Sequence, residues 1–154
     1  MELYHASKEI VQYPEVRKAK YTKDFSWGFY CTNNIKQAVR WANRGMGEPI
    51  INYYEYTPDK SLRILRFPEI SDEWLNFIAE CRSGKTHQYD IVEGPMANDT
   101  IWNYVNDYLT GRINRKQFWA LAEFKYPTNQ ISFHTLSALN CLKFVKSEVI
   151  YNDR

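Results

Sequence analysis

The chain has 154 residues, which is the length of a single domain with a sizeable core. Hydrophobic residues make up 44% of it and aromatic residues 16%, which excludes an intrinsically disordered protein. The net charge of +2 does not by itself indicate nucleic-acid binding, and the three cysteines lack the spacing of a zinc site. The sequence has neither a signal-peptide pattern nor a segment of membrane-spanning length, so we predict a cytoplasmic protein that does not contact membranes.

In chain order, the first third predicts a short strand, a loop that enters a second strand, and a helix. Asn33 or Asn34 is a suitable N-cap for this helix, and Gly45 and Gly47 end it. Apolar residues recur at helical spacing between the cap and the glycines. The predicted ranges are Leu3–Ala6, Phe25–Thr32 and Ile35–Ala42.

The remaining two thirds predict two strands, a helix, a strand, two further helices, a strand, a short helical turn and a closing strand. Ser71 is a plausible N-cap for the first of these helices, Gly84 ends that helix, and Gly94-Pro95 breaks the strand after it. The predicted ranges are Ile50–Tyr56, Leu62–Phe67, Ser71–Cys81, Tyr89–Val92, Asp99–Leu109, Arg115–Phe124, Gln130–Phe133, Leu136–Leu142 and Lys143–Tyr151.

This order of elements does not alternate strictly between strand and helix. It therefore argues against a doubly wound parallel sheet and predicts an α+β fold with two small sheets in one domain, residues 1–154. The sequence has no Gly-x-Gly-x-x-Gly, no P-loop, no His-Glu-x-x-His and no Gly-x-Ser-x-Gly motif. Any nucleotide must be bound by a less common arrangement.

Three distant segments carry polar or aromatic side chains on or beside predicted strands. His5 lies in Leu3–Ser7, Tyr30 in Gly28–Thr32, and Gln130 at the start of a late strand. A histidine can bond ribose hydroxyls or a carboxamide, and a tyrosine face can stack on nicotinamide. Taken singly, His5 is better explained as a structural histidine, and the Tyr30 segment is explained at least as well as an ordinary aromatic core strand.

Together the three segments resemble the His-Tyr-Glu class of ADP-ribosyltransferases, the diphtheria-toxin and poly(ADP-ribose) polymerase type. In that class a histidine lies on the first core strand, Gly-x-Tyr lies on the next, and a catalytic glutamate begins a late strand. Here His5, Gly28-Phe29-Tyr30 and Gln130 stand in those places. Nearly the whole chain also resembles a bacterial family of small ADP-ribosyltransferase-like domains, often regarded as toxins of toxin–antitoxin pairs.

The resemblance implies a split β-sheet core with flanking helices and a catalytic set of His5, Tyr30 and Gln130. NAD would be the substrate, with no metal. His5 would hold a ribose hydroxyl and the nicotinamide amide, the Ala6 backbone would bond the carboxamide, and Tyr30 would stack on nicotinamide. The residues expected to bind the cofactor are Tyr4, Ala6, Ser7, Thr32, Asn98 and Asp99.

Several of these assignments have alternatives. Glutamine at position 130 brings neither charge nor base, so we expect either slower NAD cleavage than a glutamate would give or dependence on an acceptor that is already ionised. Asp99 is equally a helix N-cap or a carboxylate near the acceptor. The basic side chains that could otherwise reach a pyrophosphate are better explained as surface ion pairs, and these are Arg40, Arg44 and Arg82.

The remaining assignments concern one cysteine and two histidines. Cys31, beside Tyr30, is expected to be a buried and inert thiol rather than a nucleophile. His87 and His134 are interpreted as incidental, although strand alternation would place His134 on the same face as Gln130, at the rim of the pocket.

The leading hypothesis is an NAD-dependent ADP-ribosyltransferase that acts inside a bacterial cell as a toxin or defence effector. Its target would be a protein or a nucleic acid, and its partner a small antitoxin protein. The alternatives are an NAD hydrolase, a module that binds NAD or ADP-ribose without cleaving it, and an interaction protein that binds no NAD.

Overall fold

The computed structural model describes residues 1–18, 23–97, 99–122 and 128–151. Within these ranges the chain forms seven strands and five helices, and the predicted α+β class is confirmed. The strands are β1 (Glu2–Ser7), β2 (Phe29–Cys31), β3 (Ile50–Tyr56), β4 (Ile64–Arg66), β5 (Ile91–Gly94), β6 (Gln130–Phe133) and β7 (Leu142–Val149). The helices are α1 (Ile35–Ala42), α2 (Asp72–Arg82), α3 (Asp99–Leu109), α4 (Arg115–Leu121) and α5 (Leu136–Leu139).

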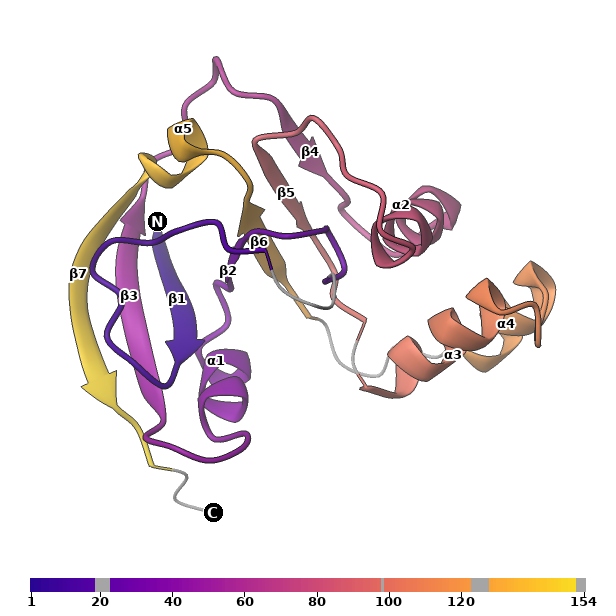
Figure 1. The fold of residues 1–154 in the computed structure, drawn as a ribbon, viewed down its shortest axis with the longest axis horizontal. Coiled ribbons are helices and arrows are strands. Elements are labelled where there is room, and N and C mark those ends of the chain that lie inside the picture. The colour runs from indigo at the N-terminus through magenta and orange to yellow at the C-terminus, as the bar shows by residue number, and fades with distance from the viewer. Residues whose placement is uncertain (19–22, 98, 123–127, 152–154) are drawn as a thin grey trace.

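The strands form two sheets that lie side by side (Figure 1). The first sheet has the order β1-β3-β7 and is antiparallel throughout. The second has the order β2-β6-β5-β4, with β4 and β5 parallel. One isolated antiparallel bridge, between Tyr4 of β1 and Thr32 just after β2, joins the two sheets. Each residue of this bridge donates its N–H to the carbonyl oxygen of the other, at 2.9 Å.

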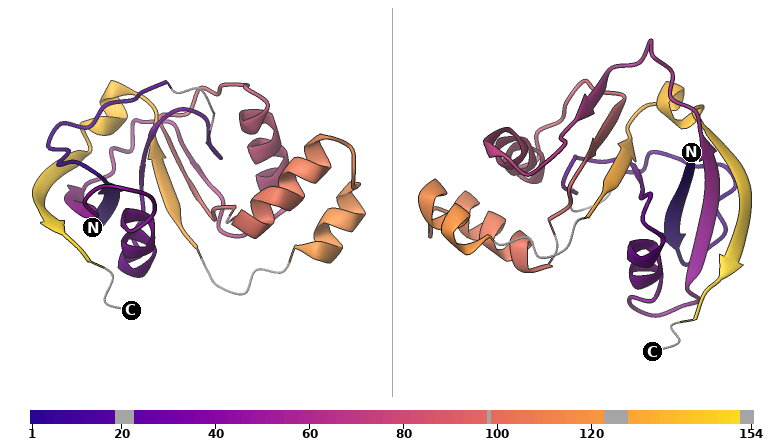
Figure 2. Two further views of the ribbon diagram at one scale, coloured as in Figure 1. Left: turned by 60° about the horizontal axis from the view of Figure 1, so that its bottom comes forward. Right: turned by 180° about the vertical axis from the view of Figure 1, so that it is seen from behind.

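Three apolar clusters hold these layers together. The first lies between the sheets, where Leu3, Tyr54 and Phe133 are fully buried. A small cluster packs α1 against β1 and β3. The third packs α2, α3 and α4 beside the second sheet, away from β7 (Figure 2). Burial of apolar side chains therefore holds the two sheets against each other and holds the helices against each sheet.

Local sequence signals explain where the helices begin. Asn34, and not Asn33, caps α1 by accepting from the N–H of Gln37, and Ser71 caps α2 as predicted. Gly84 follows α2 with a φ of 99°, a conformation that favours glycine. The longest helices have 11 residues, whereas a span needs about 20, and no helix in the described ranges is both long and apolar enough to cross a bilayer.

The boundaries differ from the predicted ones mainly in the second sheet. The predicted strand Leu62–Phe67 is shortened to β4, and the predicted strand Tyr89–Val92 is shifted to β5, which continues through Gly94. Gly94, the last residue of β5, has its backbone close to Phe67. A Cβ atom at position 94 would lie 3.0 Å from the Phe67 Cβ, so the close approach favours glycine. The helix predicted to reach Phe124 ends at Leu121, and residues 123–127 lie outside the described ranges.

The cluster between the sheets predicts a clear difference between two leucines. Leu3 is fully buried, whereas Leu136 is 76% exposed. Leu3→Ala should lower the free energy of unfolding by about 2–5 kcal/mol because it leaves a cavity between the sheets. Leu136→Ala should change it by less than about 0.5 kcal/mol. Urea unfolding of both variants measures this, and equal losses would contradict the assignment of Leu3 to the shared core.

Candidate functional site

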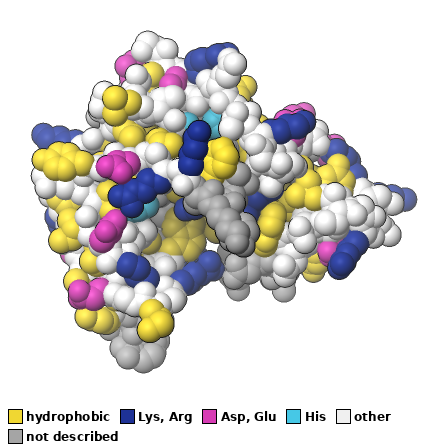
Figure 3. Space-filling view, viewed as in Figure 1, with side chains coloured by type: hydrophobic (Ala, Val, Ile, Leu, Met, Phe, Trp, Pro, Cys, Tyr) yellow, Lys and Arg dark blue, Asp and Glu magenta, His cyan; other side chains and the backbone are white. Residues whose placement is uncertain are grey.

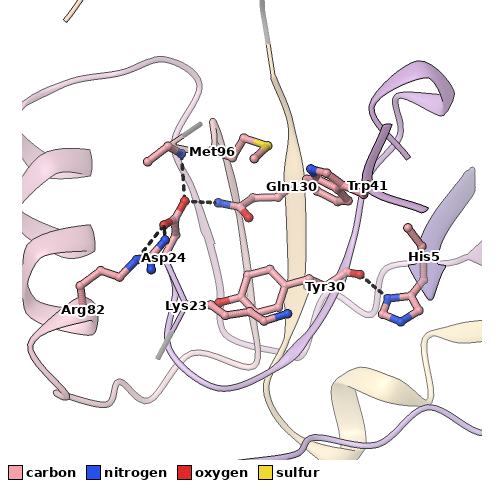
Figure 4. A pocket seen from close by; sticks show the side chains of 10 residues that line it. His5, Lys23, Asp24, Tyr30, Trp41, Arg82, Met96 and Gln130 are labelled. Atoms are coloured by element: carbon pink, nitrogen blue, oxygen red, sulfur yellow. Dashed lines mark hydrogen bonds and ion pairs between the residues drawn. The ribbon is translucent and has the colours of Figure 1, made fainter. Parts of the chain in front are cut away.

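A cavity of about 260 Å³ lies where the two sheets separate. Its walls come from β1, β2, β6, α1, α2 and the loops before β2 and after β5. The three residues predicted as catalytic, His5, Tyr30 and Gln130, meet in this cavity (Figure 4). The other lining residues are Ala6, Lys23, Asp24, Trp41, Arg82, Met96 and Ala97.

The cavity exists because β1 and β2 stop pairing after one bridge. In a continued antiparallel ladder, Ala6 and Tyr30 would form the next hydrogen-bonded pair after Tyr4 and Thr32. Instead the His5 side chain donates a hydrogen bond to the Tyr30 carbonyl, with 2.6 Å between Nδ1 and the oxygen. Backbone groups alternate in direction along a strand, so the N–H and C=O of Ala6 point toward the split, as those of Tyr4 do.

The bond to Tyr30 fixes the tautomer of His5. A carbonyl oxygen only accepts, so Nδ1 carries the hydrogen and Nε2 is left as an acceptor. Desolvation lowers the pKa of His5 to about 4, against a weaker opposing effect of this hydrogen bond. The ring also stacks on Phe29, with centroids 4.0 Å apart. His5 is therefore a neutral, oriented acceptor near pH 7.

Tyr30 contributes its ring to the cavity and its hydroxyl to the loop before β2. The hydroxyl donates to the Ser26 carbonyl at 2.6 Å and accepts from the Phe25 N–H at 3.0 Å. Burial raises the pKa of Tyr30 well above its usual value, so the phenol stays protonated. The Nζ atom of Lys23 lies 5.0 Å from the ring centroid, which is a cation–π distance.

The loop of residues 23–28 is fastened at several points. The Ser26 N–H bonds the Lys23 carbonyl at 3.0 Å, and Ser26 has a φ of 76°, which is strained for a residue with a side chain. His87 donates from Nε2 to the Phe25 carbonyl, and His134 donates from Nδ1 to the Trp27 carbonyl. This loop holds Asp24 in place at the edge of the cavity.

Asp24 is the central polar residue of the cavity wall, and it is 4% exposed. Its carboxylate accepts from the Arg82 guanidinium, from the Ala97 N–H at 2.9 Å and from Gln130 Nε2 at 3.0 Å (Figure 4). Arg82 in turn lies over the Trp102 ring, at 3.8 Å. The sequence alone favoured a surface ion pair for Arg82. In the structure Arg82 forms its ion pair with Asp24 in the cavity wall.

A second cavity of about 240 Å³ adjoins the first and shares His5 and Lys23 with it. Its lining comes from Ser7 at the end of β1, from Glu9, Arg17 and other residues of the segment after β1, and from Gly28 and Phe29. On the face drawn in Figure 3 the surface is hollowed between the two sheets, with Lys and Arg side chains around the hollow. The two cavities form an extended site with three cationic side chains and three carboxylates in its lining, and Arg17 is ion-paired with both Glu9 and Glu15.

The predicted cofactor-binding residues are distributed unevenly. Ala6 lines the first cavity and Ser7 the second, whereas Tyr4 and Thr32 line neither. Tyr4 packs edge-on against Tyr53 and donates its hydroxyl to Glu2, and buried Thr32 accepts from the Asn34 N–H. Both contribute by forming the bridge between the sheets.

The predictions for Asn98 and for the Asp99 side chain lie outside the described residues. His134, interpreted as incidental although alternation left the rim of the pocket open to it, follows the end of β6 and does not line the cavity. Its Nε2 accepts from Ser132 Oγ at 2.6 Å instead. Its ring lies edge-on to the Tyr30 ring, with the two centroids 6.3 Å apart.

The thiol and metal predictions can be compared with the described residues. Cys31 is fully buried, and burial raises its pKa well above the usual value, as expected of an inert thiol. Within the described ranges, no group of three or more His, Cys, Asp or Glu side chains has the arrangement of a metal site.

The sequence did not predict three of the residues that line the cavity, which are Lys23, Asp24 and Trp41. Asp24 stands directly before an aromatic-rich segment, where an acidic residue is unremarkable in a loop. Its burial was the informative property, and this depends on Arg82 and Gln130, which are 58 and 106 positions away. No local pattern in the sequence carries that information.

Residues 1–144 match a protein family described as "Protein of unknown function (DUF3990)". The chain belongs to this family. No curated protein and no solved structure matches the chain. These comparisons assign no activity to the chain, so its function is inferred from the site itself.

The buried histidines predict a loss of stability in acid. His5 and His134 have pKa values lowered to about 4 from 6.5, mainly by desolvation. The unfolded chain therefore binds protons first, and the free energy of unfolding should fall as the pH drops from about 6.5 to about 4, by up to about 1.4 kcal/mol per pH unit for each histidine. NMR titration of the histidine Cε1 resonances and urea unfolding across this range measure both effects, and a His5 resonance that titrates near 6.5 would contradict the assignment.

Proposed function

We propose that this chain is an NAD-dependent ADP-ribosyltransferase that acts as a toxin or defence effector in the cytoplasm of a bacterium. In this proposal residues 1–154 form one ADP-ribosyltransferase-like domain, with the two sheets as its split core. The observation that carries the proposal is the open edge of β1 at Ala6, beside the Tyr30 ring and the oriented His5.

The open edge suits a planar carboxamide. Ala6 has one backbone donor and one acceptor toward the split, and a carboxamide has an acceptor oxygen and an NH2 donor in one plane. A flat aromatic ring attached to that carboxamide can then stack on the Tyr30 ring. The positive charge of the nicotinamide ring in NAD strengthens such stacking. Lys23, which lies over Tyr30, has to move aside when the ring enters.

The polar side chains suit the ribose of the same molecule. His5 Nε2 accepts one ribose hydroxyl, because its other nitrogen is occupied by the Tyr30 carbonyl. Gln130, on β6 across the cavity, accepts a second hydroxyl. The second cavity, reached past Lys23, gives room for the phosphates and adenosine. Bound NAD would thus give hydrogen-bond partners to the Ala6 N–H and C=O groups, which have no partner among the described strands at the split.

The reaction breaks the bond between the nicotinamide nitrogen and the ribose carbon. The bond electrons leave with nicotinamide, and the ribose acquires oxocarbenium character, as in glycoside cleavage. An acceptor nucleophile on a protein or nucleic acid then bonds the ribose carbon and loses its proton. A small antitoxin protein would restrain this activity in the producing cell.

A second function has one observation in its favour. Gln130 is neutral, and it stands where a glutamate would stabilise the positive charge of the ribose. A domain that binds NAD or ADP-ribose without cleavage needs only the hydroxyl bond that glutamine makes. NAD hydrolysis, with water as acceptor, is a third outcome of the same site.

The test is nicotinamide release from labelled NAD, with and without bacterial lysate. We expect release that depends on lysate and that falls on the order of 10²-fold or more in Tyr30→Ala and in His5→Ala, because each removes a group that positions NAD. Tyr151→Ala is a matched control, since Tyr151 is 65% exposed and lines neither cavity.

Circular dichroism and thermal unfolding must show that the two site variants are folded. Release without lysate would favour the hydrolase. Calorimetric binding of intact NAD without release, abolished by Tyr30→Ala, would favour the binding module. Absence of both binding and release would reject the proposal and leave the interaction protein.

A further inference from the structure

Asp24 is held by more hydrogen bonds than an ion pair needs. Its Oδ1 accepts from Arg82 Nε at 3.0 Å and from Arg82 Nη2, and its Oδ2 accepts from the Ala97 N–H and from Gln130 Nε2. These donors come from α2, from the segment after β5 and from β6. A buried carboxylate with four donors is fixed in direction and leaves no lone pair for substrate.

This fixed carboxylate determines how the Gln130 amide is turned. A carboxylate accepts and does not donate, so Gln130 can face it only with the NH2 group. The amide oxygen is then turned away from Asp24 (Figure 4). Because Gln130 is 5% exposed and lines the cavity, that oxygen is the part of the side chain offered to a ligand.

We propose that Asp24 is a positioning residue, which holds the Gln130 amide with its oxygen toward the cavity so that it accepts a hydroxyl group of the substrate. This inference rests on the proposed function for the identity of that hydroxyl, a ribose hydroxyl of NAD. The orientation of the amide itself does not depend on the proposed function.

The loop geometry supports a positioning role. Asp24 lies in the loop of residues 23–28. The backbone of this loop is hydrogen-bonded by the side chains of Tyr30, His87 and His134. The strained φ of 76° at Ser26 lies two residues from Asp24. Such strain is retained where surrounding contacts fix the backbone, and it is frequent at functional sites.

The same geometry explains why glutamine suits position 130 of this chain. A glutamate there would put a second carboxylate within hydrogen-bond distance of Asp24, with no hydrogen between them unless one is protonated. Arg82 already pairs with Asp24. The cavity thus has its carboxylate at position 24 and a neutral acceptor at position 130. This contact reverses the expectation from the sequence alone, and we expect Gln130→Glu to impair the site rather than improve it.

The first readout requires no NAD. In Gln130→Glu, ¹³C NMR of the carboxyl groups should show that the introduced carboxyl has a pKa more than about one unit above 4.3, because two adjacent carboxylates share a proton. The other titratable or charged groups lining this cavity are His5, Lys23, Tyr30 and Arg82, and their resonances should be followed where they are visible. Gln88→Glu is the matched control, because the exposed Gln88 oxygen accepts from Arg63 and a carboxylate there keeps a donor.

If the carboxyl introduced at position 130 titrates like the one introduced at position 88, the proposal is overturned, since Asp24 would then not face position 130. A raised pKa also predicts a stability effect with a definite sign. The folded variant binds the extra proton, so its free energy of unfolding should decrease relative to the wild type as the pH rises toward about 8.

The second readout is nicotinamide release. Gln130→Glu should release nicotinamide about tenfold or more slowly than the wild type at about pH 8, and the difference should narrow toward about pH 5, where the carboxyl pair retains a proton. A Gln130→Glu variant that merely folds less well would release nicotinamide more slowly at every pH and would not give this pH profile. Faster release by Gln130→Glu across the range would overturn the positioning role.

The two hypotheses fail in different ways. If the wild type neither binds nor cleaves NAD, the proposed function fails, and the carboxyl titration still decides whether Asp24 orients Gln130. If the wild type cleaves NAD and the carboxyl introduced at position 130 titrates normally, the proposed function stands and the positioning role is rejected.

Discussion

The rest of the structure depends on the single bridge between Tyr4 and Thr32, because among the described strands the two sheets are joined by backbone–backbone hydrogen bonds only there. Beyond it β1 and β2 diverge, and every backbone group at the divergence needs another partner or contact with solvent. His5 supplies one partner by bonding the Tyr30 carbonyl. The neighbouring Ala6 edge is left open, so the candidate site follows directly from the point at which backbone pairing stops.

A buried charge places the second constraint on the site. Taking the Asp24 carboxylate out of water is costly, and the cost is offset only when several donors surround it. Arg82, the Ala97 N–H and Gln130 are these donors, and each comes from a different part of the chain. The network therefore ties the loop before β2 to α2 and β6. It makes one arrangement of the cavity wall much more favourable than alternatives with an unpaired carboxylate.

Local signals in the sequence predicted much of the secondary structure. Ser71 and Ile50–Tyr56 were predicted correctly because an N-cap and an apolar strand depend on neighbouring residues. Boundaries were less accurate where they depend on packing, as at Gly94 beneath Phe67. These errors occur where contacts distant in sequence decide the end of an element.

The sequence by itself determined the α+β order of elements and, through a family resemblance, singled out His5, Tyr30 and Gln130. Only the tertiary structure brought these three side chains to one cavity, and only it made Asp24 part of the wall. The physical reason is that a side chain's chemistry depends on its surroundings. An aspartate in a loop is an ordinary solvated acid until folding buries it against an arginine 58 positions away and an amide 106 positions away.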